Sequence, residues 1–282
     1  MSAEIALKTI TRYIQGQSEQ LNDRLAIEEP LEIRLEYGPE NLRIQKNISI
    51  TMRTPGHDKD LTRGFLFTEG IVQNVDQIVS IDPVIRPFLQ TPDPNVILAK
   101  AAYEAELELS KLERHFYTTS SCGVCGKSSI EAIRTVQDRH ISEEKMLVDA
   151  AWITHLPDLL RKSQEVFDST GGLHASALFE VGGSLTLLRE DVGRHNALDK
   201  LIGAALKQGL ALNQCVLLLS GRASFELIQK AAMAGIPLVA AVGAPSSLAV
   251  DLATEFGITL VGFLKSERFN VYSHPERINL KP

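Results

Sequence analysis

Three apolar stretches near the end of the chain decide the fold: Cys215-Val216-Leu217-Leu218-Leu219, Ile236-Pro237-Leu238-Val239-Ala240-Ala241-Val242 and Ile258-Thr259-Leu260-Val261-Gly262-Phe263-Leu264. Each has the length of a strand and little polar content, which is typical of strands buried on both faces. Residues 223–234 and 248–256 lie between them and repeat apolar side chains at helical spacing, and a glycine follows each. The order strand, helix, strand, helix, strand predicts a parallel sheet with right-handed crossovers.

The rest of the chain adds an antiparallel hairpin and a separate first half. Residues 177–180 and 184–188 have the pattern of two strands around a Gly182-Gly183 turn, after a predicted helix over 153–167. In the first half, alternation over 31–37 and 42–52 predicts a hairpin, 58–69 a helix, and 71–85 and 96–102 further strands. Residues 1–25 are polar, with three isoleucines at a weak helical spacing. We therefore expect an α/β domain with a mixed, partly parallel sheet, preceded by a smaller N-terminal α+β domain.

The segments that follow the three buried strands carry the residues of a ligand site. Ligands of parallel sheets bind at the carboxyl ends of the strands, where helix N-termini attract anions. These ends offer small residues and cations, so the sequence predicts a phosphate-bearing, nucleotide-like ligand near Arg222, Ser246, Lys265 and Arg268. Neither G-x-G-x-x-G nor a Walker loop is present, which disfavours an NAD-dependent enzyme or an ATPase.

A crowded polar segment precedes the first of these strands. It places Asp191, Arg194 and His195 at a strand end beside a helix start, a composition that is unusual for packing. A solvated turn held by ion pairs is the alternative interpretation. His174 follows Gly171-Gly172 and is either a ligand-facing residue or a satisfied core histidine. His57 is interpreted as a turn or cap residue, and Cys215 as a packing residue.

The reactive candidates are Cys122 and Cys125 in Ser121-Cys122-Gly123-Val124-Cys125-Gly126. Small polar neighbours indicate an exposed loop, and a capping box over 128–131 places the thiols ahead of a helix N-terminus that favours the thiolate. A C-x-x-C pair serves redox chemistry, sulfur transfer or half of a zinc site. No second cysteine pair follows, and His174-Ala175-Ser176 lacks the glutamate of zinc deaminases. We expect no zinc and no other resident metal.

Composition narrows the classes of function. A net charge of −6 argues against a protein that coats nucleic acid. No apolar run approaches the ~20 residues that span a bilayer, and residues 1–10 lack the apolar region of a signal peptide. We expect a cytoplasmic protein that binds neither nucleic acid nor membrane.

Taken together, these motifs resemble the formate dehydrogenase accessory sulfurtransferases, the FdhD family. The resemblance runs from about residue 28 to residue 277 and rests on eight segments in this order: 29–33, 64–70, 121–126, 172–175, 190–200, 220–222, 260–263 and 272–275. Each segment alone is weak, and the ordered set is specific. The resemblance implies a cytidine-deaminase-like three-layer domain and a homodimer. We expect an N-terminal domain at 1–116, the C-x-x-C loop with its helix at 117–140, and the α/β domain at 141–282.

The same resemblance implies a chemistry. FdhD proteins take sulfur from a cysteine desulfurase as a cysteine persulfide. They pass it to the molybdenum or tungsten bis-molybdopterin guanine dinucleotide cofactor of formate dehydrogenase, for which GDP is a partial mimic. The persulfide cysteine corresponds to Cys122, with Cys125 as its partner, and the cofactor segment to Phe263, Leu264, Lys265, Ser266, Glu267 and Arg268. Members often have Pro-Gly at the positions of Ser266-Glu267, a departure that affects the fine shape of this loop.

Both lines of reasoning lead to one mechanism with two rivals. We expect Cys122 to take the terminal sulfur by thiol exchange, and Cys125 either to accept it in turn or to release it by forming a disulfide. The cofactor would lie on the strand ends, with His174, Asp191, Arg194 and His195 in the same cleft. The rivals are a cofactor-delivery chaperone with a redox-sensitive or metal-bound cysteine clip, and a free-standing disulfide reductase.

Overall fold

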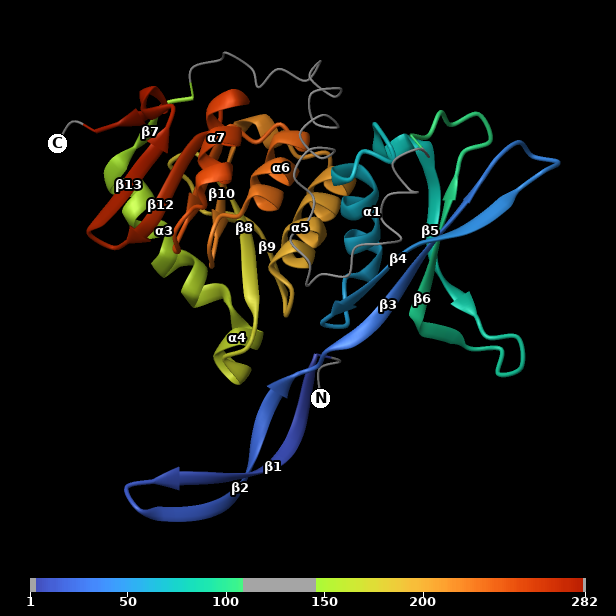
Figure 1. Cartoon of the computed structure of the whole chain (residues 1–282), viewed down its shortest axis with the longest axis horizontal. Helices are drawn as coiled ribbons and strands as arrows, with labels where there is room; N and C mark the ends of the chain where they lie inside the picture. The colour runs from blue at the N-terminus through green and yellow to red at the C-terminus, as the bar shows by residue number, and fades with distance from the viewer. Residues whose placement is uncertain (1–3, 109–145, 281–282) are drawn as a thin grey trace.

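The computed structural model describes residues 4–108 and 146–280, and Figure 1 shows how they are arranged. Its larger sheet has six strands in the order β13-β12-β11-β10-β8-β9. The strands are β8 (His174–Glu180), β9 (Leu185–Asp191), β10 (Cys215–Leu219), β11 (Leu238–Ala241), β12 (Thr259–Lys265) and β13 (Arg268–Ser273). β10, β11 and β12 pair in parallel, whereas β8, β9 and β13 pair antiparallel to their neighbours. The predicted parallel unit and the predicted hairpin are both confirmed.

Helices cover both faces of this sheet, because its strands alternate apolar side chains between two cores. Val216 and Leu218 pack with α3 (Ala150–Ser163) on one face. Leu217 and Leu219 pack on the other face with α5 (Arg194–Gln208), α6 (Phe225–Met233) and α7 (Ser247–Glu255). The result is the expected three-layer α/β domain.

The helix predicted over 153–167 is two helices, α3 and the short α4 (Glu165–Thr170). The carboxylate of Glu190, at the end of β9, accepts the backbone N–H groups of Val166 and Phe167 at 3.3 and 3.1 Å. These two N–H groups belong to the first turn of α4, so the side chain of Glu190 caps this helix. The apolar pattern of the sequence continues through the junction of α3 and α4 and does not reveal that a second helix begins there.

The first half forms a four-stranded sheet in the order β4-β3-β6-β5, covered on one face by α1 (Asp58–Thr68). The strands are β3 (Glu29–Tyr37), β4 (Ile44–Arg53), β5 (Ile78–Ile85) and β6 (Pro92–Ala101). α1 also packs against α5, and one apolar core joins the two halves. At the crossing of these two helices, a Cβ added to Gly64 would overlap the carbonyl oxygen of Asp199. Figure 1 shows α1 and α5 side by side between the two sheets.

The isoleucines near the start of the chain have a weak helical spacing, but residues 5–26 do not form a helix. They form β1 (Ile5–Ile14) and β2 (Gln17–Ala26), an antiparallel pair that projects from the body in Figure 1. Gln15 and Gly16 form the turn with φ of 50° and 89°. Two left-handed residues make the tight turn that matches the twist of two strands, and this turn overrides the helical spacing.

Short elements complete the described chain. β7 (Val148–Asp149) pairs in parallel with β14 (Ile278–Asn279), and 3-10 turns occupy Val75–Gln77, Leu212–Gln214 and Pro275–Arg277. None of the helices in the described ranges combines the length and the apolar character that crossing a membrane requires.

Candidate functional site

The parallel ladder of β10, β11 and β12 continues past the ends of these strands. Gly243 N–H donates to the carbonyl of Gly221 at 2.9 Å, and Phe263 N–H donates to the carbonyl of Gly243 at 3.1 Å. The three predicted ligand segments therefore begin side by side. A Cβ at position 243 would lie 2.9 Å from the backbone nitrogen of Arg222, so glycine permits this approach. Phe263 is 43% exposed at a left-handed φ of 51°, a strained conformation that is enriched at functional sites.

His174 begins β8 and lies against this edge. Its Nδ1 would be 3.4 Å from a Cβ at position 221, so the ring covers a glycine. Within the described residues, neither ring nitrogen has a hydrogen-bond partner. Burial, followed by the positive charges of Arg194 and His195, lowers the pKa of His174, and Asp191 opposes the shift. The imidazole is therefore neutral at pH 7 and open to a ligand.

The N-terminus of α5 faces the same edge. Gly193 is its N-cap and supplies no side-chain acceptor, and Arg194 is its first residue. The Nε of Arg194 is buried and has no partner in the described part of the chain. A helix N-terminus with a guanidinium beside it favours a negatively charged group.

His195 connects α5 to the first turn of α6. Its Nε2 lies 2.7 Å from Oε2 of Glu226 and 3.4 Å from Oγ of Ser224. The hydrogen bond from His195 lowers the pKa of Glu226. For His195, these contacts agree with the alternative interpretation of this segment as a turn held by ion pairs, and not with a ligand-binding residue. Arg222 is exposed nearby and has no hydrogen bond or ion pair among the described residues.

Asp191 faces inward. Its carboxylate accepts from the backbone N–H groups of Thr54 at 3.1 Å and Gly193 at 2.8 Å, and pairs with Lys200 at 2.6 Å. Asn196 Nδ2 adds a fourth contact at 3.3 Å. With these partners, Asp191 holds the strand end in place and leaves no free oxygen lone pair of obvious use to a ligand.

The segment from Phe263 to Arg268 has one buried residue, Leu264, and its other residues are exposed. Leu264 is 1% exposed and packs in the core under α3. Lys265 pairs with Arg268 across the β12–β13 turn, which also holds Ser266 and Glu267, and all four are exposed. No hydrogen bond or ion pair links this turn to another described residue. Ser246 accepts from Ala249 N–H at 3.3 Å and is the N-cap of α7.

The predicted reactive residues, Cys122 and Cys125, lie outside the described residues, as does the predicted helix after them. The remaining cysteine, Cys215, is buried, and burial raises the pKa of its thiol, which agrees with a packing role.

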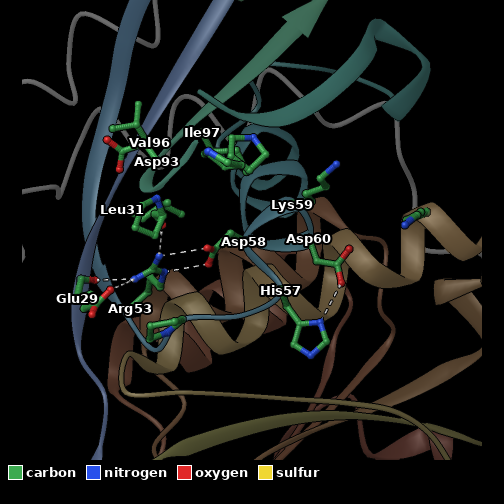
Figure 2. A pocket seen from close by; sticks show the side chains of 15 residues that line it. Glu29, Leu31, Arg53, His57, Asp58, Lys59, Asp60, Asp93, Val96 and Ile97 are labelled. Atoms are coloured by element: carbon green, nitrogen blue, oxygen red, sulfur yellow. Dashed lines mark hydrogen bonds and ion pairs between the residues drawn. The ribbon is translucent and has the colours of Figure 1, made fainter. Parts of the chain in front are cut away.

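A cavity of about 490 Å³ lies elsewhere, between the four-stranded sheet and the N-terminus of α1. Figure 2 shows its charged side, where Arg53 bonds to Asp58 at 2.9 Å and His57 lies 3.7 Å from Asp60. His57 occupies the N-cap position of α1, as expected for a cap residue, but its side chain makes no capping hydrogen bond within residues 4–108 and 146–280. Of the predicted site residues that the structure describes, none lines this cavity.

Lys200 and Thr54 were not among the predicted site residues. Lys200 Nζ donates to the carbonyl of Thr54 at 2.8 Å and pairs with Asp191, so the pair connects the site to the first half of the chain. A signal for Lys200 exists in the sequence. Lys200 comes three residues after Ala197 and four before Ala204, so it lies on the apolar face of its helix. A lysine on such a face indicates a buried ion pair, because lysine is almost never fully buried without a partner.

The geometry defines an α/β protein with a three-layer domain and a positively charged, glycine-lined strand edge suited to an anion. The model of the FdhD/NarQ family matches residues 26–279, and the chain belongs to this family. The chain is 49% identical over 277 residues to "Sulfur carrier protein FdhD" of Streptomyces avermitilis, covering 97% of this chain and 95% of that one. Identity to the protein of the same name from Mycolicibacterium paratuberculosis is 48% over 276 residues, with coverage of 96% and 97%.

A solved structure extends the likeness to the fold. A protein assigned as a formate dehydrogenase accessory protein from Desulfotalea psychrophila superposes with a TM-score of 0.70 and covers 98% of this chain and 100% of that one. The two sequences are 24% identical, so this likeness concerns the fold alone.

Proposed function

We propose that this protein is a sulfur carrier that takes persulfide sulfur from a cysteine desulfurase and transfers it to a bis-molybdopterin guanine dinucleotide cofactor, holding molybdenum or tungsten, for formate dehydrogenase. One observation carries the proposal. About half of the residues are identical to those of proteins named sulfur carrier over nearly the full length of both chains, and this chain has Cys122 and Cys125 in a C-x-x-C.

The loading step is a thiol exchange. The Cys122 thiolate attacks the terminal sulfur of the donor persulfide, the donor S–S bond breaks, and the donor leaves as a thiolate. Cys122 then carries the outer sulfur as a persulfide. For release, attack by the Cys125 thiolate on the inner sulfur forms a Cys122–Cys125 disulfide and frees hydrosulfide. Attack on the outer sulfur instead moves the persulfide to Cys125. Both routes use reduced thiols, the state that the cytoplasm maintains.

The strand edge supports binding of the cofactor as substrate. A pterin guanine dinucleotide carries phosphate groups. This edge offers the N-terminus of α5, which no side chain in the described part of the chain caps, the guanidinium of Arg194 and the imidazole of His174. Arg222 adds a cation. We assign the phosphates to these residues, and propose that Lys265 and Arg268 contact the same molecule from the β12–β13 turn. The observed partners of Asp191 argue that it positions the strand end and does not touch the ligand.

Mass spectrometry of the full-length protein tests the proposal. After incubation with a cysteine desulfurase and free cysteine, the peptide with Cys122 and Cys125 should gain the mass of sulfur and lose it when molybdenum cofactor is added. Cys122→Ser should prevent loading, and Cys215→Ser is the matched control that should not. An unmodified thiol pair in the wild-type protein would favour the cofactor-delivery chaperone.

A further inference from the structure

The cavity between the four-stranded sheet and the N-terminus of α1 combines apolar side chains with rigid walls. Its volume of about 490 Å³ lies within the range of pockets that hold ligands, about 300–1,000 Å³. The buried side chains of Leu31 and Ile97 line it. Four further lining residues are prolines: Pro55, Pro83, Pro92 and Pro94. A proline ring fixes φ and removes the N–H donor, so these walls are pre-organised and suit side chains, not a paired strand.

The cavity also contains one uncompensated acidic group and one uncompensated basic group. The guanidinium of Arg53 bonds to both carboxylate oxygens of Asp58, at 2.9 and 3.1 Å, and lies 3.7 Å from Oε2 of Glu29. Figure 2 shows Arg53 between these two carboxylates. One cation between two carboxylates leaves a net negative charge, and the Glu29 side chain is 44% exposed. Lys207, in the last turn of α5, is exposed and has no hydrogen bond or ion pair among the described residues.

The other charged side chains of the cavity are paired with groups outside it. Lys59 bonds to Asp82 at 2.7 Å, Asp60 to Arg189 at 3.0 Å and Asp93 to Arg86 at 3.1 Å. Burial, followed by the charge of Arg189, lowers the pKa of His57, so this lining residue is neutral at pH 7. Glu29 and Lys207 are therefore the groups that select the charge of a ligand.

An exposed apolar tip lies beside the cavity. Pro92, in the cavity wall, pairs with Ile85, and residues 86–91 close the β5–β6 hairpin between them. Phe88 is 98% exposed and Leu89 is 63% exposed in this turn, which reaches beyond the end of the sheet in Figure 1. Two backbone hydrogen bonds within 86–91, of 2.9 and 3.0 Å, hold the turn. An ordered turn that keeps an aromatic ring in water favours contact with another molecule.

We propose that the cavity and the Phe88 tip form one docking site for an extended segment of a partner protein, in which an apolar side chain lies between a basic and an acidic residue. The apolar side chain fills the cavity, the basic residue meets Glu29, and the acidic residue meets Lys207. The segment continues over Phe88. A small molecule inside the cavity would leave Phe88 in water, whereas a protein segment covers both. The site is separate from the strand edge proposed for the cofactor and does not depend on sulfur transfer.

Panning a phage-displayed library of random peptides on the full-length protein tests the proposal. The enriched peptides should share an apolar residue flanked by Lys or Arg and by Asp or Glu. In fluorescence polarisation, the most enriched peptide should have a dissociation constant roughly tenfold higher for Phe88→Ala and roughly threefold higher for Glu29→Gln than for wild type. The matched controls are Leu42→Ala and Glu40→Gln, exposed residues of the β3–β4 turn at the other end of the sheet, which should bind like wild type.

Reversing the charge of Lys207 separates recognition from folding. Lys207→Glu changes an exposed side chain that has no partner in the described part of the chain, so circular dichroism should show an unaltered fold. The variant should bind the selected peptide more weakly than wild type does. It should prefer a peptide in which the acidic residue is replaced by Lys. A change in stability alone does not exchange one preference for the other.

Four outcomes would overturn the assignment. The first is a library from which no sequence is enriched, and the second is an enriched peptide that binds wild type, Phe88→Ala and Glu29→Gln equally. The third is a Lys207→Glu protein that still prefers the acidic peptide. The fourth is a Phe88→Ala protein with a lower mass than wild type in sedimentation velocity, which would show that the tip contacts a second copy of this chain.

Discussion

Lys200 Nζ lies 2.6 Å from Oδ2 of Asp191, and the two side chains are 1% and 0% exposed. The pair lies where the end of β9, the first turns of α5 and the Thr54 segment meet, because Lys200 also donates to the carbonyl of Thr54 and Asp191 accepts from its N–H. A single buried ion pair therefore ties the first half of the chain to the strand end that carries the candidate site.

Lys200→Met should strongly destabilise the protein. It leaves the Asp191 carboxylate buried without its cation, which typically costs about 3–5 kcal/mol. Urea unfolding followed by circular dichroism measures the loss. Lys207→Met changes an exposed lysine of the same helix and should alter the free energy of unfolding by less than about 0.5 kcal/mol. Equal effects from both variants would show that the buried pair contributes nothing particular.

Gly64→Ala should loosen the junction of the two halves. The added methyl group overlaps the carbonyl oxygen of Asp199 across the α1–α5 crossing, so the helices must separate, at a cost of at least about 1–3 kcal/mol. The control is Gly172→Ala, whose nearest neighbour lies at 3.9 Å. Thermal unfolding of the two variants should differ, and a wild-type midpoint for Gly64→Ala would contradict the observed helix contact.

Arg194→Ala should weaken the binding of GDP. A lost charge-assisted hydrogen bond lowers affinity by about 10-fold to 100-fold, and the Nε of Arg194 has no described protein partner to lose. Isothermal titration calorimetry measures the effect, with Arg161→Ala on α3 as the control, since Arg161 pairs on the surface with Asp168. Arg268→Ala should also weaken binding if the β12–β13 turn contacts the ligand. Unchanged affinity in Arg194→Ala would remove this residue from the site.

The affinity for a phosphate-bearing nucleotide should rise as the pH falls through the range below 6.5. Burial and neighbouring cations lower the pKa of His174, so the ring is neutral at pH 7 and gains its positive charge only on acidification. A cationic imidazole attracts phosphate more strongly than a neutral one. Calorimetry with GDP at pH 8 and near pH 6 tests this, and His174→Gln should reduce the difference. Titration of the nucleotide itself affects both proteins alike, so identical pH profiles would exclude His174.

The free energy of unfolding should also depend on pH through His174, and it should fall as the pH falls. The unfolded chain binds a proton at His174 near pH 6.5, more readily than the folded chain does. The contribution of His174 is therefore present above pH 6.5 and is lost as the pH falls through the lowered folded-state pKa. As the pH falls below 6.5, the urea midpoint of wild type should fall relative to that of His174→Gln. A constant gap between them would contradict the shift.

Local patterns were sufficient for most of the architecture. The apolar runs at 215–219, 236–242 and 258–264 predicted parallel strands. A strand that is buried on both faces is apolar throughout and does not alternate apolar with polar residues. The same order predicted that Gly221, Gly243 and Phe263 lie together, since parallel strands end at one edge of a sheet. The C-x-x-C at Cys122 and Cys125 is also visible in the sequence alone.

Tertiary contacts decided the remainder, because they depend on groups that are distant in the chain. Glu190 starts a second helix at α4, and the left-handed pair Gln15–Gly16 turns a weakly helical pattern into a ribbon. Asp191 was predicted to face the ligand, and its partners Thr54 and Lys200 turn it inward. The sequence by itself determined the parallel unit, the hairpin before it and the family, and it shows the C-x-x-C pair. Only the folded chain determined which polar groups are satisfied internally and which, like the Nε of Arg194 and the ring of His174, have no hydrogen-bond partner among the described residues, since hydrogen-bond satisfaction depends on three-dimensional neighbours.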